Sequence, residues 1–166
     1  MFEQGLGEKS IYLVDGNIGN ALGENFDGDV LEGIKGTLPS AELTDEFKEQ
    51  LLEVDPDLQD FSYGPETYDA VIITALAAEQ AGTDNPPDIA AEINDVTREG
   101  KVCETFLECK ELIQAGEDID YDGVGGPYEF IDAGEPSAAS FAILQYGAGN
   151  TIDDSLTEFR TAALPE

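Results

Sequence analysis

Residues 118–136 read Asp-Ile-Asp-Tyr-Asp-Gly-Val-Gly-Gly-Pro-Tyr-Glu-Phe-Ile-Asp-Ala-Gly-Glu-Pro, and an apolar run over 138–146 follows them. This stretch has two interpretations that predict different proteins. As a metal loop, it carries hard oxygen ligands at the spacing of a calcium hand, with a glycine where such a loop turns sharply. The candidate metal ligands in this interpretation are Asp118, Asp120, Asp122 and Glu129.

The second interpretation is a pair of strands. A glycine–proline turn opens a strand over 128–131, residues 132–134 turn the chain, and a strand over 140–146 returns. A calcium hand requires a helix that leaves the loop, whereas Gly134 and Pro136 do not propagate a helix. The sequence therefore favours the strands, and a calcium-binding module is the alternative.

The composition is that of a folded but very acidic chain. Of its 166 residues, 41% are hydrophobic and 8% are aromatic, which suits one domain with a sizeable core or part of a larger one. There are 37 acidic residues against 7 basic ones, and the net charge is −30. Such a chain repels phosphate backbones and anionic lipids, so its charge argues against nucleic acid and membrane surfaces as partners.

The residue types also limit the chemistry. The chain contains no histidine, which removes histidine-based triads and histidine metal sites from consideration. Carboxylates are so plentiful that no pair stands out as a general acid and base. We therefore predict neither catalysis nor a cofactor. No run approaches the roughly 18 apolar residues of a transmembrane helix.

The first residues of the chain are typical of the interior of a fold. Residues 1–7 look like the end of a helix with its glycine stop, and not like an export signal. We therefore expect the chain to begin inside a larger structure.

A short apolar run over 11–14 predicts a buried parallel strand. Asp15, Asn17 and Asn20 follow it directly. Loops beyond the carboxyl ends of parallel strands are where open α/β sheets bind ligands. These three residues are therefore candidate ligand contacts, although Asp, Gly and Asn are also ordinary turn residues.

Helices are predicted in the middle of the chain. One begins at Thr44 and ends before Pro56, and a longer one runs from Gly64 to Gly82. The expected core side of the long helix consists of Tyr68, Val71, Ile72, Ala75, Leu76 and Ala78. Tyr63 immediately precedes this helix and is placed to reach a cleft with its hydroxyl, with packing as the alternative role.

Cys103 and Cys109 are the two cysteines of the chain. Within one continuous helix they would lie about 9 Å apart along the axis, too far for a disulfide. If a helix begins near Thr105, Cys103 precedes it and the two residues can meet. We expect that disulfide in an oxidising compartment, because two cysteines without histidine make a poor zinc site.

Three groups of residues together resemble one family. They are Tyr68-Asp69-Ala70-Val71 in an alanine-rich helix, the spaced cysteines followed by Ile119-Asp-Tyr-Asp-Gly-Val-Gly-Gly-Pro127, and Phe130…Gly134-Glu-Pro136 before an Ala-Ile-Leu-Gln-Tyr strand. Their order and spacing resemble the C-terminal portion of the Leu/Ile/Val-binding-protein-like substrate-binding proteins of branched-chain amino acid ABC transporters. The resemblance covers residues 2–150 and implies an α/β fold of the type I periplasmic-binding class, with a parallel sheet and flanking helices.

Members of this family have two α/β lobes joined by three crossing strands at a hinge. These proteins work outside the cytoplasm. Their lobes close on a small solute, an amino acid or amide, and deliver it to a membrane permease. The resemblance implies four segments in this chain. They are a second-lobe segment over 1–60, a helical first-lobe segment with the cysteine pair over 61–125, a hinge strand pair over 126–150 and a tail over 151–166.

The resemblance also assigns roles. It implies that the loop after the first strand contacts the solute, with the Asp15 carboxylate neutralising a ligand ammonium or Asn17 making a neutral contact. The chain departs from the family pattern at Ile131, which separates Phe130 from Asp132. On this resemblance we expect the sequence to omit the N-terminal sheet of the first lobe and to expose sheet edges and apolar faces where that sheet would dock.

Overall fold

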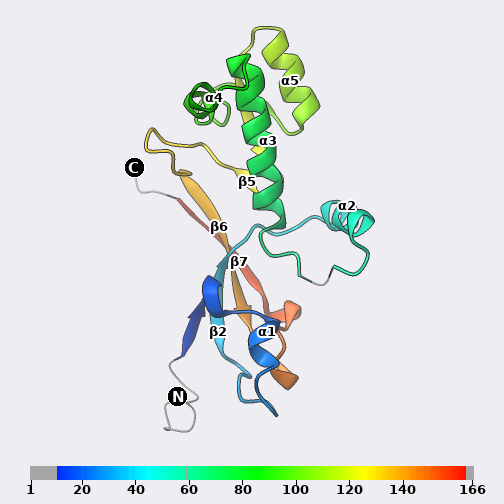
Figure 1. The fold of residues 1–166 in the computed structure, drawn as a ribbon. Helices are drawn as coiled ribbons and strands as arrows, with labels where there is room; N and C mark the ends of the chain where they lie inside the picture. Colours follow the sequence, from blue (N-terminus) through cyan, green and yellow to red (C-terminus); the bar gives the residue numbers. More distant parts are fainter. Residues whose placement is uncertain (1–10, 59, 164–166) are drawn as a thin grey trace. The chain divides into compact units, whose positions relative to one another are not determined.

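A computed structural model describes residues 11–58 and 60–163, so the helix end expected over 1–7 lies outside the described residues. The chain forms two compact units (Figure 1). The first unit consists of Met1–Pro39 and Phe141–Arg160, and the second of Ser40–Ser140 and Thr161–Glu166. The chain therefore passes from one unit to the other three times, between 39 and 40, between 140 and 141, and between 160 and 161.

The first unit contains a mixed sheet with short helical turns. In chain order the elements are β1 (Tyr12–Val14), η2 (Asp15–Asn17), α1 (Asn20–Gly23), β2 (Lys35–Pro39), β6 (Ala138–Gln145), η3 (Ala148–Asn150), η4 (Asp154–Leu156) and β7 (Glu158–Ala163), of which β6 and β7 extend into the second unit. The strand order is β1-β2-β6-β7. β1 runs parallel to β2, and β2 runs antiparallel to β6 with Lys35 opposite Gln145.

The expected parallel strand after residue 10 is confirmed, but its expected burial is wrong. Tyr12 is 79% exposed and Val14 is 54% exposed. β1 is the outermost strand in the order of this sheet, and only its partner β2 lies beside it within the described residues. The apolar run therefore forms an edge strand, and within the described residues one face and one edge of this strand are open to solvent.

The core of the first unit is small. Leu31, Ile34 and Tyr146 are buried together, and five partly buried side chains pack against them: Ile11, Leu13, Ile18, Leu22 and Ile152. Buried Asn150 ties the loop before β2 to the segment after β6. Its side chain accepts a hydrogen bond from the Leu31 backbone N–H at 2.8 Å and donates to the Gly28 carbonyl at 2.6 Å.

The second unit is richer in helices. Its elements are α2 (Asp45–Val54), α3 (Gly64–Ala81), α4 (Pro86–Glu92), β3 (Lys101–Cys103), α5 (Phe106–Gln114), β4 (Ile119–Gly123) and β5 (Gly126–Pro127). Both α4 and α5 pack against α3 (Figure 1). The strand order is β3-β4-β5, with β3 and β4 parallel and β4 and β5 antiparallel. Its buried core consists of Ile73, Leu76, Ala77, Val96, Cys103, Cys109, Ile119 and Tyr121.

Local signals correctly predicted the helices α2 and α3. The Thr44 hydroxyl accepts a hydrogen bond from the Phe47 backbone N–H and caps α2, which ends two residues before Pro56. α3 has a proline in its first turn and ends at Gly82, whose backbone is left-handed with φ 63°.

The predicted core side of α3 is confirmed in part. Leu76 is 0% exposed and Ile72 packs against the core, whereas Tyr68 is 42% exposed and Val71 is 63% exposed. The buried residues of the helix are Pro65, Asp69, Ile73, Leu76 and Ala77. Apolar residues occupy both sides of this helix, so the 3.6-residue period did not decide which side is buried. The side that contains Asp69 faces the core because its carboxylate has hydrogen-bond donors there.

Asp69 connects α3 to the β4–β5 hairpin. Its carboxylate accepts hydrogen bonds from the Tyr121 hydroxyl at 2.7 Å, the Tyr128 hydroxyl at 2.8 Å, and the backbone N–H groups of Val124 at 3.2 Å and Gly125 at 2.6 Å. A Cβ on Gly123 would overlap this carboxylate, which explains a glycine at that position. The glycine-rich stretch is therefore a turn that wraps a buried charge.

The strand pair expected around residue 132 forms only in part. β6 confirms the returning strand, and the turn over 132–134 is closed by a hydrogen bond from the Gly134 N–H to the Ile131 carbonyl at 2.8 Å. Residues 128–131 form no strand, only an isolated bridge between Phe130 and Pro136. β6 pairs instead with β2, from Lys35 opposite Gln145 to Pro39 opposite Phe141.

The four segments implied by the resemblance stay a prediction, because the two compact units do not define lobes, a hinge or a tail. The first boundary between the units lies at residue 39, and α2 belongs to the same unit as α3. The residues expected to form a hinge pair, 126–150, divide between the two units at 140. Within the described residues, the helices lack the combination of length and apolar character that crossing a membrane requires.

Candidate functional site

The candidate ligand loop of the first unit follows β1 directly. Asp15 and Asn17 lie in η2, and Asn20 begins α1. All three side chains are exposed. The structure therefore brings these residues together on one short loop after a parallel strand, which is the position expected of them.

All three candidate side chains accept hydrogen bonds within the chain. The Asn17 side-chain oxygen accepts a hydrogen bond from the Val14 N–H at 2.9 Å, and the Asn20 side-chain oxygen accepts one from the Ile152 N–H at 2.8 Å. Asp15 accepts only from the neighbouring Gly16 N–H, at 2.8 Å, among the hydrogen bonds of the described residues. Asp15 is therefore the member of this loop best suited to a charged ligand, because a carboxylate retains acceptor capacity after one such bond.

Tyr63 belongs to the second unit. It is the residue before α3, its backbone is left-handed with φ 60°, and its side chain is 41% exposed. It lines a hollow of about 450 Å³ together with Leu51, Leu58, Asp60, Phe61, Ser62, Gly64, Thr67, Tyr68 and Val71. A left-handed backbone is uncommon for tyrosine, and such positions cluster at functional sites.

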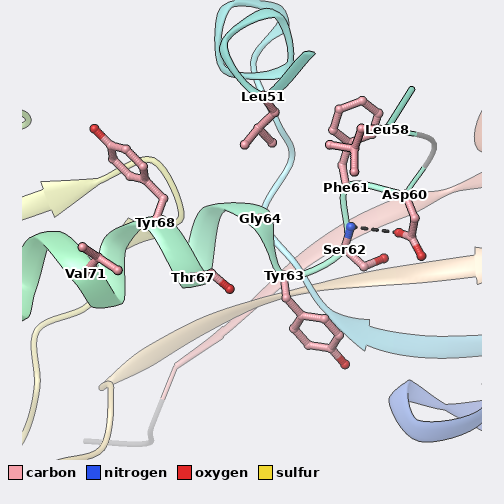
Figure 2. A pocket seen from close by; sticks show the side chains of 10 residues that line it. All are labelled: Leu51, Leu58, Asp60, Phe61, Ser62, Tyr63, Gly64, Thr67, Tyr68 and Val71. Carbon is pink, nitrogen blue, oxygen red and sulfur yellow. Dashed lines mark hydrogen bonds between the residues drawn. The ribbon is translucent and has the colours of Figure 1, made fainter. Parts of the chain in front are cut away.

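The side chains around this hollow do not converge on one point. The rings of Tyr63 and Tyr68 point away from each other (Figure 2). Tyr68 packs edge-to-face against Phe47 of α2, with 5.4 Å between ring centroids. The Asp60 carboxylate accepts a hydrogen bond from the Ser62 N–H at 2.9 Å and so closes a local turn. The hollow is thus mainly apolar, and Tyr63 contributes an exposed ring beside it.

The stretch 118–129 is a hairpin and not a calcium hand. β4 and β5 occupy it, and Glu129 is followed by the turn over 132–134 and not by a helix. Among the residues that the structure describes, no group of three or more acidic, cysteine or histidine side chains has the arrangement of a metal site. The candidate ligands Asp118, Asp120, Asp122 and Glu129 therefore remain carboxylates of a strand and its flanks.

These carboxylates nevertheless affect one another. Partial burial raises the pKa of Asp120, and the negative charges of Glu129, Asp122 and Asp118 raise it further. Burial also raises the pKa of Tyr121 and Tyr128, followed by their hydrogen bonds to the Asp69 carboxylate. Both tyrosines are therefore protonated donors throughout the physiological pH range.

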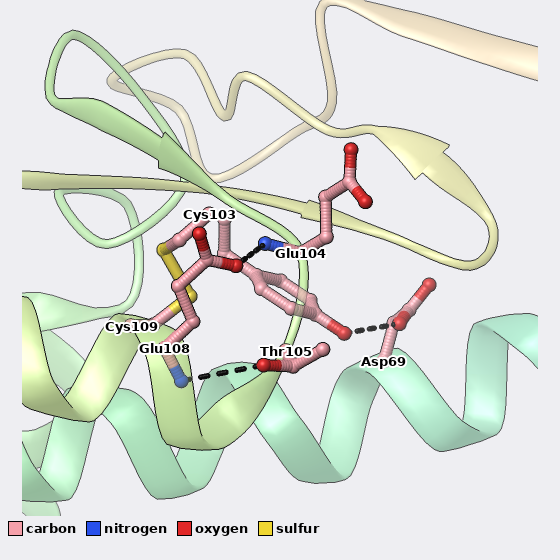
Figure 3. Close-up of a disulfide and its surroundings, with 7 residues drawn as sticks. Asp69, Cys103, Glu104, Thr105, Glu108 and Cys109 are labelled. Atoms are coloured by element: carbon pink, nitrogen blue, oxygen red, sulfur yellow. Dashed lines mark hydrogen bonds between the residues drawn. A yellow bond between two sulfur atoms is a disulfide. The ribbon is translucent and has the colours of Figure 1, made fainter.

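Cys103 and Cys109 form a disulfide with their Cα atoms 5.4 Å apart (Figure 3). Cys103 ends β3, and Thr105 caps α5 by accepting a hydrogen bond from the Glu108 N–H at 3.2 Å. The Glu108 carboxylate accepts a hydrogen bond from the Glu104 N–H at 3.1 Å. The helix thus begins between the two cysteines, which is the condition under which they can meet. Both are buried, at 1% and 0% exposure.

Sequence reasoning missed two residues that join parts of the chain distant in sequence, Asp69 in the second unit and Tyr146 in the first. Asp69 lies in the predicted helix but was read only as part of a motif, and Tyr146 was read only as the end of a strand. Their contacts join residues 52 and 127 positions apart, and no local pattern marks such pairs.

Together, the two units and their sheets match a fragment of the type I periplasmic-binding fold. A solved structure that shows this is the leucine-binding protein LivK from Thermotoga maritima, with a TM-score of 0.61 and 19% sequence identity. The similarity covers 98% of this chain and 39% of that protein, so this chain spans well under half of its length. No protein-family model and no curated protein matches this sequence.

Proposed function

We propose that this chain is the C-terminal part of an extracytoplasmic solute-binding protein, which captures an amino acid or a related amide for an ABC transporter permease. The observation that carries the proposal is the threefold passage of the chain between two units, at the end of β2 and within β6 and β7, in a fold similar to that of a leucine-binding protein. Three such crossings suit a receptor whose lobes close on a solute.

In this proposal the solute lies against the loop after β1. The exposed Asp15 carboxylate neutralises the solute's ammonium through charge-assisted hydrogen bonds. The oxygens of Asn17 and Asn20 hold the loop in shape through their bonds to Val14 and Ile152. No catalytic step and no cofactor belong to this function.

The location outside the cytoplasm follows from the same proposal. A buried disulfide within a seven-residue segment suits an oxidising compartment, and a net charge of −30 keeps a secreted protein soluble.

The test is a ligand titration by thermal shift and calorimetry, with L-leucine, other amino acids, small amides and CaCl2. A specific solute at 100 times its Kd adds about 2.7 kcal/mol to the free energy of unfolding. Asp15→Asn is expected to weaken amino acid binding by about tenfold or more, because it replaces a charge-assisted bond by a neutral one. Asp27→Asn is the matched control, since it removes one exposed carboxylate from the same unit.

Two outcomes would count against the proposal. If only calcium raises the unfolding midpoint, the chain is a metal-binding module. If Asp15→Asn and Asp27→Asn bind an amino acid as tightly as the unmodified chain, Asp15 is not its ammonium partner.

A further inference from the structure

Tyr146 is held rigidly in the core of the first unit. It follows β6 directly, is 0% exposed, and its ring is buried with Leu31 and Ile34. Its backbone N–H donates to the Ile34 carbonyl at 3.0 Å, and its carbonyl accepts from the Gly33 N–H at 2.8 Å. The backbone and the ring of Tyr146 are therefore held in place independently of the contacts of its hydroxyl.

The Tyr146 hydroxyl contacts one residue of the candidate ligand loop twice. It donates to the Gly19 carbonyl at 2.6 Å and accepts from the Gly19 N–H at 3.1 Å. A phenolic hydroxyl can act in both roles at once. Gly19 is the residue directly before α1, so this pair of bonds fixes the main chain in the middle of the loop.

Other contacts hold the loop on either side of Gly19. The Ile18 N–H donates to the Val14 carbonyl at 3.0 Å, which closes the turn that contains Asp15. On the other side, Asn20 accepts from the Ile152 N–H, and a Cβ on Gly23 would overlap the Asn150 carbonyl. Between these two anchors, the Tyr146 hydroxyl is the buried group that bonds to the loop's main chain.

We propose that Tyr146 is a positioning residue for the solute site: its hydroxyl orders the loop 15–20 and so presents the Asp15 carboxylate in one orientation. This inference rests on the proposed function of that loop. The turn Asp15–Asn17 connects Gly19 to the carboxylate, and it is closed by two hydrogen bonds to Val14: the Asn17 side-chain oxygen accepts from the Val14 N–H, and the Ile18 N–H donates to the Val14 carbonyl. A preorganised loop binds more tightly, since less conformational freedom is lost on binding.

The test compares Tyr146→Phe with the unmodified chain. The variant removes only the hydroxyl and keeps the ring in the core. Hydrogen–deuterium exchange of the amides in 15–20 is the direct readout, and we expect the Gly19 amide to exchange at least tenfold faster. Calorimetry with L-leucine as the probe is the second readout, with an expected rise in Kd of about fivefold.

Tyr121→Phe is the matched control. It also removes one buried tyrosine hydroxyl, but from the second unit, where that hydroxyl bonds to Asp69. We expect it to lower the unfolding midpoint about as much as Tyr146→Phe does, while exchange in 15–20 and the affinity for L-leucine stay unchanged.

The outcomes separate the two proposals. Unchanged exchange in 15–20 would overturn the positioning role, whatever the chain binds. Suppose that Asp15→Asn weakens solute binding, and that Tyr146→Phe speeds exchange but leaves the Kd unchanged. Tyr146 would then order the loop without contributing to solute binding, and its positioning role for the solute would be overturned. If the unmodified chain binds neither an amino acid nor a small amide, the proposed function fails, and the exchange result alone decides whether Tyr146 orders the loop.

Discussion

The Tyr121 hydroxyl donates a hydrogen bond of 2.7 Å to the Asp69 carboxylate, across 52 residues of sequence. Tyr121 is a residue of β4 and Asp69 is buried in α3, so this bond joins the sheet of the second unit to its longest helix. The carboxylate also accepts from the Tyr128 hydroxyl and from two backbone N–H groups. A buried charge with this many donors specifies how the hairpin lies on the helix.

Removing this charge should be strongly destabilising. Asp69→Ala leaves the hydroxyls of Tyr121 and Tyr128 and two N–H groups without their acceptor, and we expect a loss of about 3–5 kcal/mol in the free energy of unfolding. Urea unfolding monitored by tyrosine fluorescence measures this. Asp95→Ala is the control, because it removes one arm of a partly exposed ion pair with Arg98 and should cost less than about 1 kcal/mol. Equal losses in the two variants would contradict the role assigned to Asp69.

Gly123 in the β4–β5 hairpin should tolerate replacement by alanine much less well than Gly16 in the loop after β1. In Gly123→Ala the new Cβ overlaps the Asp69 carboxylate, and we expect a loss of at least about 2 kcal/mol. In Gly16→Ala the Cβ has no heavy atom within 4 Å, and the expected change is within about 0.5 kcal/mol. Denaturant midpoints of the two variants test this, and a tolerated Gly123→Ala would show that the hairpin shifts easily on α3.

Loss of the disulfide should have a moderate cost. Replacing both Cys103 and Cys109 by alanine frees a short loop in the unfolded chain, which is worth about 2 kcal/mol. Because both residues are buried, a reductant should act only slowly on the folded chain and quickly in denaturant. Thiol labelling with and without urea measures the difference. Rapid labelling without urea would mean that β3 and α5 separate readily.

Replacing Asp120 by asparagine should stabilise the folded chain by an amount that depends on pH. Its pKa is raised in the folded chain, so the folded state binds this proton more tightly than the unfolded state does. Ionisation of Asp120 therefore lowers stability as pH rises through and beyond the unfolded value of about 3.9. Asp120→Asn should raise the urea midpoint at pH 7, and this gain should disappear as pH falls below that value.

The control for Asp120 is an exposed carboxylate of the same unit, Asp84. Asp84→Asn removes the same charge without the local carboxylate cluster and should give a smaller gain at pH 7. If the two variants gain equally, the effect belongs to the net charge of −30 and not to the neighbours of Asp120.

Much of the local structure was predictable from the sequence. The Thr44 cap and Pro56 bound α2, and the cysteine spacing with a helix start near Thr105 predicted the disulfide. The short apolar run before Asp15 predicted a parallel strand followed by a polar loop. These features depend on residues within a few positions of one another, where propensity, capping and turn chemistry act directly.

Only the tertiary structure decided the long-range features. The segment 119–123, which contains two aspartates and a glycine, forms a strand because it pairs with β3. α3 buries Asp69 and leaves Val71 exposed, because donors for that carboxylate arrive from residues 121–128. The Tyr146 hydroxyl reaches Gly19 only once β6 lies against β2. Hydrogen bonds between residues so distant in sequence leave no periodic pattern, so their partners emerge only when the chain is folded.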